Sequence, residues 1–438
     1  MRIYEINTAV FLAGRRLEDV DWSFVPDVDA VWLMGVWERS PAGLAIALED
    51  PGLMAGMRSA LPDLRPEDVL GSPYCVRDYV VDPRFGDLPA ARAALAERGL
   101  KLILDYVPNH VAPDHPWLAS HPEYFISGSE EDLARDPASW LRVGGSIFAR
   151  GRDPYFPAWP DVVQLNAFAP ALRAAVRALL AELSTRCDGI RCDMAMLMDN
   201  AVFARTWNRE EPDEEFWPPL IASVREDFVF IAEAYWDMEY TLQQQGFDYC
   251  YDKRLYDRLA REDAASVRGH LQAHPDYQAK LLRFVENHDE PRAATEFGKR
   301  ARAAAVVMST VPGGRLYHDG QLDGYRTHIP VFLARGPVET PDPLVRALYA
   351  PLVGLEVTDW RLLDVHDSDQ LVAWAFTDHL VVANLSDDEA WGRVQCAVHG
   401  TLTDVLTGAR FERSGPELQV GLGPWRAHVF SLSDQSSS

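Results

Sequence analysis

Four apolar stretches of the sequence end in acidic, basic or histidine side chains. These ends are Asp105-Tyr-Val-Pro-Asn109-His110, Gly189-Ile-Arg191-Cys-Asp193, Glu233 within FIAEAYW, and Glu286-Asn287-His288-Asp289. Carboxyl groups can attack a carbon atom or carry a proton, and imidazoles can hydrogen-bond to hydroxyl groups. Each group by itself could equally be a cap or a salt-bridge partner. Four such ends in one chain favour a shared polar catalytic site.

The acids near the middle of the chain differ in their neighbours. Arg191 and Asp193 are two residues apart on an expected strand, so both side chains point to the same side. A guanidinium stabilises an adjacent carboxylate, which predicts a lowered pKa and an ionised Asp193. Glu233 shares its strand phase with Ile231 and precedes two aromatic residues. That apolar setting predicts a raised pKa and a protonated Glu233.

One ionised and one protonated carboxyl group is the arrangement that breaks a glycosidic bond. One carboxylate attacks the sugar and the other group protonates the leaving oxygen, at a separation of about 5–5.5 Å in retaining enzymes. Asp289 adds a third acid that could stabilise positive charge on the sugar ring. His110 and His288 could hydrogen-bond to ring hydroxyls.

The order of expected elements explains how distant residues could meet. Helical stretches rich in Ala, Leu and Arg alternate with eight short apolar runs, which predicts an α/β fold, a (β/α)8 TIM barrel. The eight runs are Tyr4–Leu12, Ala30–Trp37, Leu100–Val107, Asp188–Ala195, Phe228–Trp236, Phe247–Asp252, Leu281–Asp289 and Gly314–Gly320. All carboxyl ends of barrel strands open on one face, so Asp193, Glu233 and Asp289 should share one pocket.

Two further regions accompany the expected barrel, which covers residues 1–110 and 166–350. Residues 111–165 form a long loop rich in Pro, Asp and aromatic residues, which predicts a small inserted lid domain after the third strand. Residues 351–438 contain short alternating runs separated by turn signals, which predicts a C-terminal antiparallel β-sandwich.

Composition limits the class of partner. The chain has 438 residues, 47% of them hydrophobic, and a formal net charge of −24, which disfavours nucleic acid and anionic membranes. Five cysteines without CxxC spacing indicate buried thiols in a reducing compartment. No apolar run approaches a membrane span, and no signal-peptide pattern is visible. We expect a cytoplasmic protein with a small-molecule or oligosaccharide substrate; the oligomeric state stays open.

The four strand-end motifs resemble the four conserved regions of the α-amylase family, glycoside hydrolase family 13. The motifs are DYVPNH, GIRCDMAML, the Glu of FIAEAYW, and FVENHD, in the family's order. WPDVVQLN (159–166) resembles the family's fifth short motif, and SPYCVRDY (72–79) resembles its segment after the second strand. The resemblance covers nearly the whole chain, including the insertion and the C-terminal sandwich.

The resemblance implies roles for individual residues. Asp193 would be the nucleophile, Glu233 the general acid and then the general base, and Asp289 the stabiliser of the sugar. The implied substrate-binding residues are Tyr74, which stacks on the ring, Arg191, which orients Asp193, and His110 and His288, which bind hydroxyls.

The segment after the nucleophile departs from many amylases. Those enzymes continue with Lys and His on the leaving-group side, whereas this chain has MAMLM at 194–198. We expect these methionines mainly to pack in the core. Asn109 and Asp161 offer two oxygen ligands, fewer than the 6–8 that calcium takes. No metal and no cofactor are therefore predicted.

The sequence thus predicts a retaining glycoside hydrolase that cleaves α-glucosidic bonds of oligosaccharides or α-glucans by double displacement. One alternative is a glycosyl-transferring member of the same family, a glucanotransferase or a disaccharide isomerase. Another is a non-catalytic carbohydrate-binding or assembly protein, which the presence of all three acids disfavours.

Overall fold

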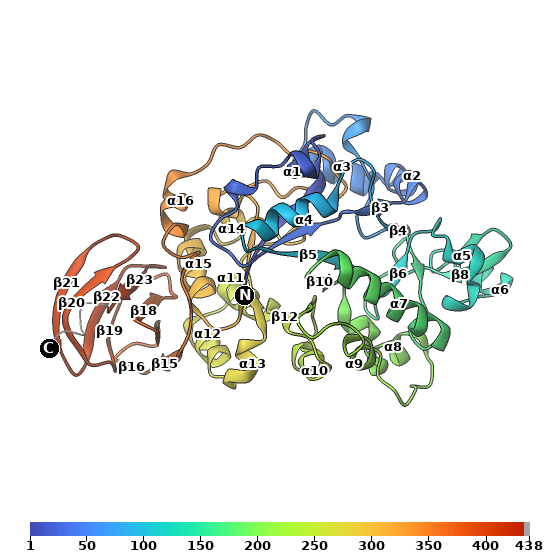
Figure 1. Ribbon diagram of the computed structural model, residues 1–438. Coiled ribbons are helices and arrows are strands. Elements are labelled where there is room, and N and C mark those ends of the chain that lie inside the picture. Colours follow the sequence, from blue (N-terminus) through green and yellow to red (C-terminus); the bar gives the residue numbers. More distant parts are fainter. Residues whose placement is uncertain (433–438) are drawn as a thin grey trace.

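The computed structural model describes residues 1–432 and contains a closed barrel of eight parallel strands (Figure 1). The strands follow one another around the barrel, and β1 closes it against β14. Each coincides with one of the eight predicted runs, so the predicted TIM barrel is confirmed. The strands are β1 (Arg2–Asn7), β2 (Ala30–Met34), β5 (Lys101–Tyr106), β10 (Gly189–Cys192), β11 (Val229–Ala232), β12 (Tyr249–Tyr251), β13 (Leu281–Arg283) and β14 (Gly314–His318).

Helices separate most of these strands in the chain. Helix α7 (Pro170–Arg186) begins with proline in its first turn and buries Leu172, Val176, Leu180 and Leu183, the spacing of one helical face. The first predicted strand run ends early, because residues after Asn7 form helix α1 (Thr8–Leu12). The other principal helices are α2 (Pro41–Glu49), α3 (Pro51–Ala60), α4 (Leu88–Glu97), α8 (Asn200–Trp207), α9 (Trp217–Ile221), α10 (Glu239–Gln244), α11 (Lys253–Arg261), α12 (Ala264–Leu271), α13 (Pro275–Ala279), α14 (Ala293–Glu296), α15 (Ala301–Thr310) and α16 (Pro343–Tyr349).

The long segment between β5 and α7 carries short elements of its own. Strand β6 (His110–Val111) pairs with β9 (Val163–Gln164), and β7 (Trp140–Val143) pairs with β8 (Ser146–Ala149). Two short helices, α5 (Trp117–Ser120) and α6 (Glu130–Arg135), complete it. An antiparallel strand pair outside the barrel, β3 (Trp37–Arg39) with β4 (Val76–Val81), contacts the segment after β6, since the Ala112 N–H donates to the Val76 carbonyl.

The chain ends in two antiparallel sheets. The six-stranded sheet holds β15 (Arg361–Leu363), β17 (Leu371–Phe376), β18 (His379–Asn384), β23 (Ala427–Ser431), β20 (Val398–Asp404) and β21 (Arg410–Gly415). The three-stranded sheet holds β16 (Val365–His366), β19 (Ala390–Val394) and β22 (Leu418–Leu422). Both contribute side chains to one apolar core, including Val382 and Leu418. The Trp374 indole donates to the Thr310 carbonyl at 3.1 Å and ties these sheets to α15.

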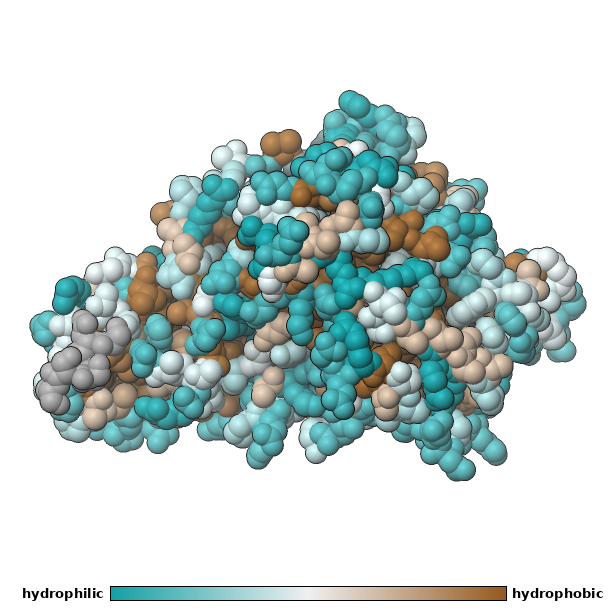
Figure 2. All heavy atoms as spheres, in the orientation of Figure 1, coloured by the Kyte–Doolittle hydropathy of each residue, from teal (hydrophilic) through white to brown (hydrophobic). Residues whose placement is uncertain are grey.

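Figure 1 shows the insertion and the C-terminal sheets on opposite sides of the barrel. The face in Figure 2 is mostly hydrophilic with small scattered hydrophobic areas, as expected for a chain of net charge −24. Within residues 1–432, no helix has the length and apolar character needed to cross a bilayer.

Candidate active site

Arg191 joins the three predicted catalytic acids at the carboxyl end of the barrel strands. Its Nη1 lies 2.8 Å from Asp193 Oδ1, and its Nη2 lies 2.7 Å from Glu233 Oε2 and 3.8 Å from Asp289 Oδ2. Strands β10 and β11 pair in parallel with Arg191 opposite Ile231. This register brings Asp193 and Glu233, each just beyond its strand, to the same level of the barrel mouth.

The Arg191 side chain is immobilised by aromatic rings. Its guanidinium carbon lies 5.2 Å from the Tyr74 ring centroid, 5.5 Å from that of Trp32 and 5.6 Å from that of Tyr251. Asp105 Oδ1 lies 3.9 Å from Nη1. A fully buried cation held among three rings and several carboxylates has little freedom to move, which makes it a fixed point for the acids around it.

Glu233 is buried and receives two hydrogen bonds. The Met194 N–H donates to Oε2 at 2.6 Å, and the Tyr235 hydroxyl donates to Oε1 at 3.0 Å. Burial raises the pKa of Glu233 to about 7, although Arg191 acts in the opposite direction. The sequence-based expectation of a raised pKa agrees with this environment, and the group can carry a proton near neutral pH.

Asp193 differs from its predicted electrostatics. Its Arg191 contact is present, but burial outweighs the guanidinium and raises the pKa of Asp193 above its ordinary value. The neighbouring carboxylates of Asp289 and Asp105 act in the same direction. The expected lowering of this pKa is therefore wrong, because sequence shows the cation but not how completely water is excluded.

His288 couples Asp289 to a carboxylate on the first strand. Its Nε2 lies 2.9 Å from Asp289 Oδ2, and its Nδ1 contacts Glu5 of β1. Burial would lower the pKa of His288, but Asp289 and Glu5 outweigh it and raise the pKa well above its ordinary value. Burial acts upward on the pKa of Asp289, but the contact with His288 brings it down to about 2. Asp289 is therefore an anion over the physiological range.

A cavity of about 360 Å³ opens above this cluster. Its lining residues are Ser72, Tyr74, His110, Trp159, Asp161, Val162, Asp193, Met194, Glu233, Tyr235, Asp289 and Phe332. Arg191 and His288 lie beneath this lining, in contact with its acids. The structure therefore brings together all seven residues singled out from the sequence. The Tyr74 hydroxyl lies 2.6 Å from His288 Nε2, and burial lowers the pKa of His110 to about 4, which leaves this imidazole neutral.

Other lining residues carried weaker signals or none in the sequence. From the sequence, Trp159 is as compatible with core packing as with stacking on a sugar. In the structure it lines the cavity, and its ring lies 5.2 Å from that of His110. Tyr235 follows Glu233 at the two-residue spacing of a strand, a signal that could have identified its hydrogen bond. Phe332 comes from a loop without any chemical motif and reaches the cavity only through tertiary packing.

Burial separates the residues around the cavity into core and lining. Phe216 and Trp217, which the sequence alone would allow to cover the pocket mouth, lie in the core, and the Trp217 indole donates to the Ala195 carbonyl at 2.9 Å. Met196 and Met198 are fully buried packing residues, as expected. Met194 is the exception because it lines the cavity.

The donor set for a metal ion is poor. Among residues 1–432, no group of three or more His, Cys, Asp or Glu side chains is arranged to hold one. The Asn109 side chain is engaged with Gln164, with Oδ1 accepting from Nε2 at 2.8 Å.

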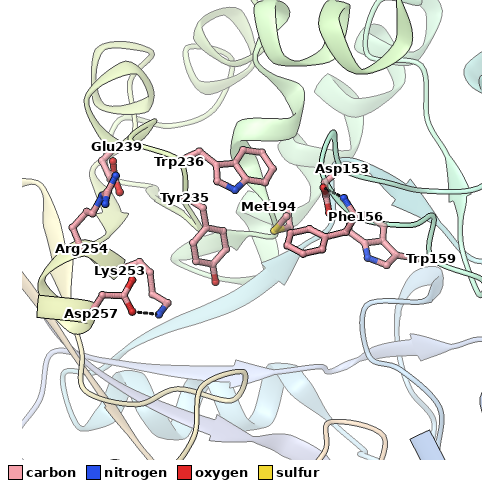
Figure 3. Close-up of a pocket in the computed structure, with 10 residues that line it drawn as sticks. All are labelled: Asp153, Phe156, Trp159, Met194, Tyr235, Trp236, Glu239, Lys253, Arg254 and Asp257. Atoms are coloured by element: carbon pink, nitrogen blue, oxygen red, sulfur yellow. Dashed lines mark hydrogen bonds and ion pairs between the residues drawn. The ribbon is translucent and has the colours of Figure 1, made fainter. Parts of the chain in front are cut away.

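A second cavity, of about 600 Å³, adjoins the first and shares Trp159, Met194 and Tyr235 with it (Figure 3). We call it the side cavity. Its other lining residues are Asp153, Phe156, Trp236, Glu239, Lys253, Arg254 and Asp257.

The relatives found by comparison with known proteins include α-amylases, α-glucosidases, a maltosyltransferase and amino acid transporter heavy chains. No protein-family model matches the chain. The chain is 27% identical over 243 residues to α-amylase MalA of Haloarcula japonica, covering 53% of this chain and 33% of that protein. It is 22% identical over 303 residues to α-amylase 3 of Dictyoglomus thermophilum, covering 62% and 57%. The matched regions thus span about a third and just over half of these relatives.

Solved structures match over nearly the entire length. An α-amylase from Lactobacillus plantarum superposes with a TM-score of 0.69 at 20% identity, over 98% of both chains. The α-amylase of Geobacillus thermoleovorans, complexed with acarbose, gives 0.67 at 17%, over 98% of this chain and 97% of that one. The trehalulose synthase MutB of Pseudomonas mesoacidophila gives 0.66 at 17%, over 98% of both. These alignments extend over the barrel and both additional regions of this chain.

Proposed function

The chain belongs to the α-amylase family, glycoside hydrolase family 13, and from this premise we propose that it cleaves α-glucosidic bonds with retention of the anomeric configuration. One observation carries the proposal. Asp193, Glu233 and Asp289, separated by up to 96 positions in the chain, gather around the guanidinium of Arg191 at the mouth of the barrel.

The first chemical step forms a bond between Asp193 and the sugar. A carboxylate oxygen of Asp193 attacks the anomeric carbon while the bond from that carbon to the leaving oxygen breaks. Glu233 gives its proton to the leaving oxygen and becomes a carboxylate. The pKa of about 7 suits this group to hold a proton before the step and to release it during the step.

The second step returns both acids to their starting states. The Glu233 carboxylate takes a proton from a water molecule, whose oxygen attacks the anomeric carbon and displaces Asp193. Two inversions at one carbon give net retention. The Asp289 anion, held by His288, stabilises positive charge that develops on the sugar ring in both steps.

Substrate binding in this proposal rests on the walls of the first cavity. Tyr74 presents its ring next to Asp289, and His110 offers a neutral imidazole to ring hydroxyls. Arg191 is too deeply buried to contact the substrate, so we assign it the positioning of Asp193 and Glu233.

Transfer to another sugar is the second candidate, because a maltosyltransferase and a trehalulose synthase are among the similar proteins. A sugar hydroxyl in place of water would be activated by Glu233 in the same second step. A non-catalytic role is disfavoured because the three acids and their cation are all present and in contact.

A product screen tests the proposal. The purified protein is incubated with maltose, maltooligosaccharides, trehalose, sucrose and isomaltose, and the anomers formed are followed by NMR. Initial release of the α-anomer supports double displacement, and longer sugars or new linkages indicate transfer. Initial release of the β-anomer, or no turnover of any α-glucoside, would contradict the proposal.

A further inference from the structure

The side cavity adjoins the first cavity next to the hydrogen-bond donors of Glu233. Met194 and Tyr235, which donate the two hydrogen bonds to Glu233, both line it. Tyr74 and Asp289, which flank the proposed sugar position, do not. Met194 and Tyr235 also line the first cavity, as Glu233 itself does, so the two cavities meet beside this acid. A group attached to the oxygen that Glu233 protonates can extend from the first cavity into the side cavity.

Half of the residues that line the side cavity are apolar or aromatic. They are Phe156, Trp159, Met194, Tyr235 and Trp236 (Figure 3). Met194 and Trp236 have positive φ angles of 43° and 60°, an unfavourable backbone conformation for such side chains. The Trp236 ring is supported from the insertion by Tyr155, with centroids 4.8 Å apart. The fold thus tolerates backbone strain at two residues of the cavity lining.

Phe156, which belongs to the insertion, exposes an apolar surface to the side cavity. Its side chain is 67% exposed, whereas the other aromatic residues that line the cavity are only partly exposed. Asp153 Oδ1 accepts hydrogen bonds from the N–H groups of Tyr155 and Phe156 at 2.7 and 2.9 Å, and these bonds hold the turn that presents the ring. Removing this exposed surface from water is favourable for any apolar group that enters.

The cations of the side cavity are neutralised by neighbouring carboxylates. Lys253 Nζ lies 2.7 Å from Asp257 and 3.3 Å from Glu290, and the Arg254 guanidinium makes two hydrogen bonds to Asp237 at 2.6 and 2.7 Å. These pairs neutralise both cations and take up two of the N–H groups of each. The methionine after Asp193 adds no polar partner of its own.

We propose that the side cavity recognises an apolar aglycone, so that the preferred substrates are α-glucosides of hydrophobic alcohols rather than α-glucans. This inference rests on the proposed function. It adds a class of substrate to that function. In this arrangement the sugar occupies the first cavity, and the aglycone packs among Phe156, Met194 and Trp236 in the side cavity.

Straight-chain alkyl α-glucosides from ethyl to hexyl test this inference. Their leaving oxygens have nearly the same basicity, so chain length changes apolar contact without changing the chemistry. We expect kcat/KM to rise with each added CH2, by up to roughly fourfold per group, until the cavity is filled. Values that stay flat or fall with chain length, or maltotriose cleaved faster than hexyl α-glucoside, would overturn the proposal.

Two variants test whether the rise of kcat/KM with chain length depends on the side cavity. Phe156→Ala should flatten the dependence of kcat/KM on chain length, whereas Trp391→Ala, which removes a 72% exposed aromatic side chain from β19, should retain it. Melting temperatures establish that both variants are folded. Loss of the dependence in the Trp391 variant, or its retention in the Phe156 variant, would count against the assignment.

A binding measurement separates this inference from the proposed function. Calorimetry with Asp193→Asn protein compares ethyl and hexyl α-glucoside without any turnover. Tighter binding of the hexyl compound supports the apolar site even if hydrolysis fails, and equal binding contradicts it even if hydrolysis succeeds.

Discussion

The buried guanidinium of Arg191 donates a 2.8 Å hydrogen bond to Asp193 Oδ1. Its other terminal nitrogen lies 2.7 Å from Glu233 Oε2 without the alignment of a hydrogen bond. Burial raises the pKa of both acids, so this difference in alignment decides between them. Negative charge is better stabilised on Asp193, and the proton resides on Glu233.

Asp193→Asn should reduce kcat/KM by at least about a thousandfold, because the amide cannot form the glycosyl ester. The amide oxygen can still accept from Arg191, so the melting temperature should change little. Steady-state kinetics with the best substrate of the product screen checks this. Asp227→Asn, at an exposed site paired with Arg225, is the control. Near-normal turnover by Asp193→Asn would refute its role as nucleophile.

Glu233→Gln should affect substrates according to their leaving groups. Loss of a general acid typically costs about 10²–10⁴-fold in rate, and we expect that loss for alkyl α-glucosides. An activated aryl α-glucoside needs no proton on its leaving oxygen, so its first step should suffer far less. The ratio of kcat/KM values for the two substrates measures the difference. Equal losses would show that Glu233 is not the acid.

The pH profile follows from the protonation of Glu233. Because the protonated form is required and its pKa is about 7, kcat/KM should decline as the pH rises through about 7. Tyr235→Phe removes a donor to the carboxylate and leaves the anion less stable, so the decline should move to higher pH. Tyr240→Phe, at a 60% exposed position, should leave the profile unchanged. A shift to lower pH in Tyr235→Phe would contradict this reasoning.

The positions of the site residues could be predicted because barrel geometry, rather than loop detail, brings strand ends together. Asp193, Glu233 and Asp289 each follow a short apolar run, and a closed parallel barrel has a single carboxyl face. The upward shift of the Asp193 pKa could not be predicted from the sequence, because it depends on how completely the surrounding residues exclude water. The contact of Glu5 with His288 could not be predicted either. The two residues are 283 positions apart, and Glu5 lies within an apolar strand whose pattern indicates only a buried core.

Glu5→Gln tests whether this distant carboxylate keeps His288 charged. The variant removes one of the two acids that raise the pKa of His288, so that pKa should fall. A folded-state pKa above the unfolded value gives stability that is present below about 6.5 and is lost as the pH rises through the folded-state pKa. The fall in the free energy of unfolding should therefore end at a lower pH in the variant, and its value at pH 6 should be about 1–3 kcal/mol lower than in the wild type. Urea unfolding across pH, with NMR titration of His288, measures both. Glu18→Gln is the exposed control, and an unchanged His288 titration in Glu5→Gln would show that Asp289 alone holds the charge.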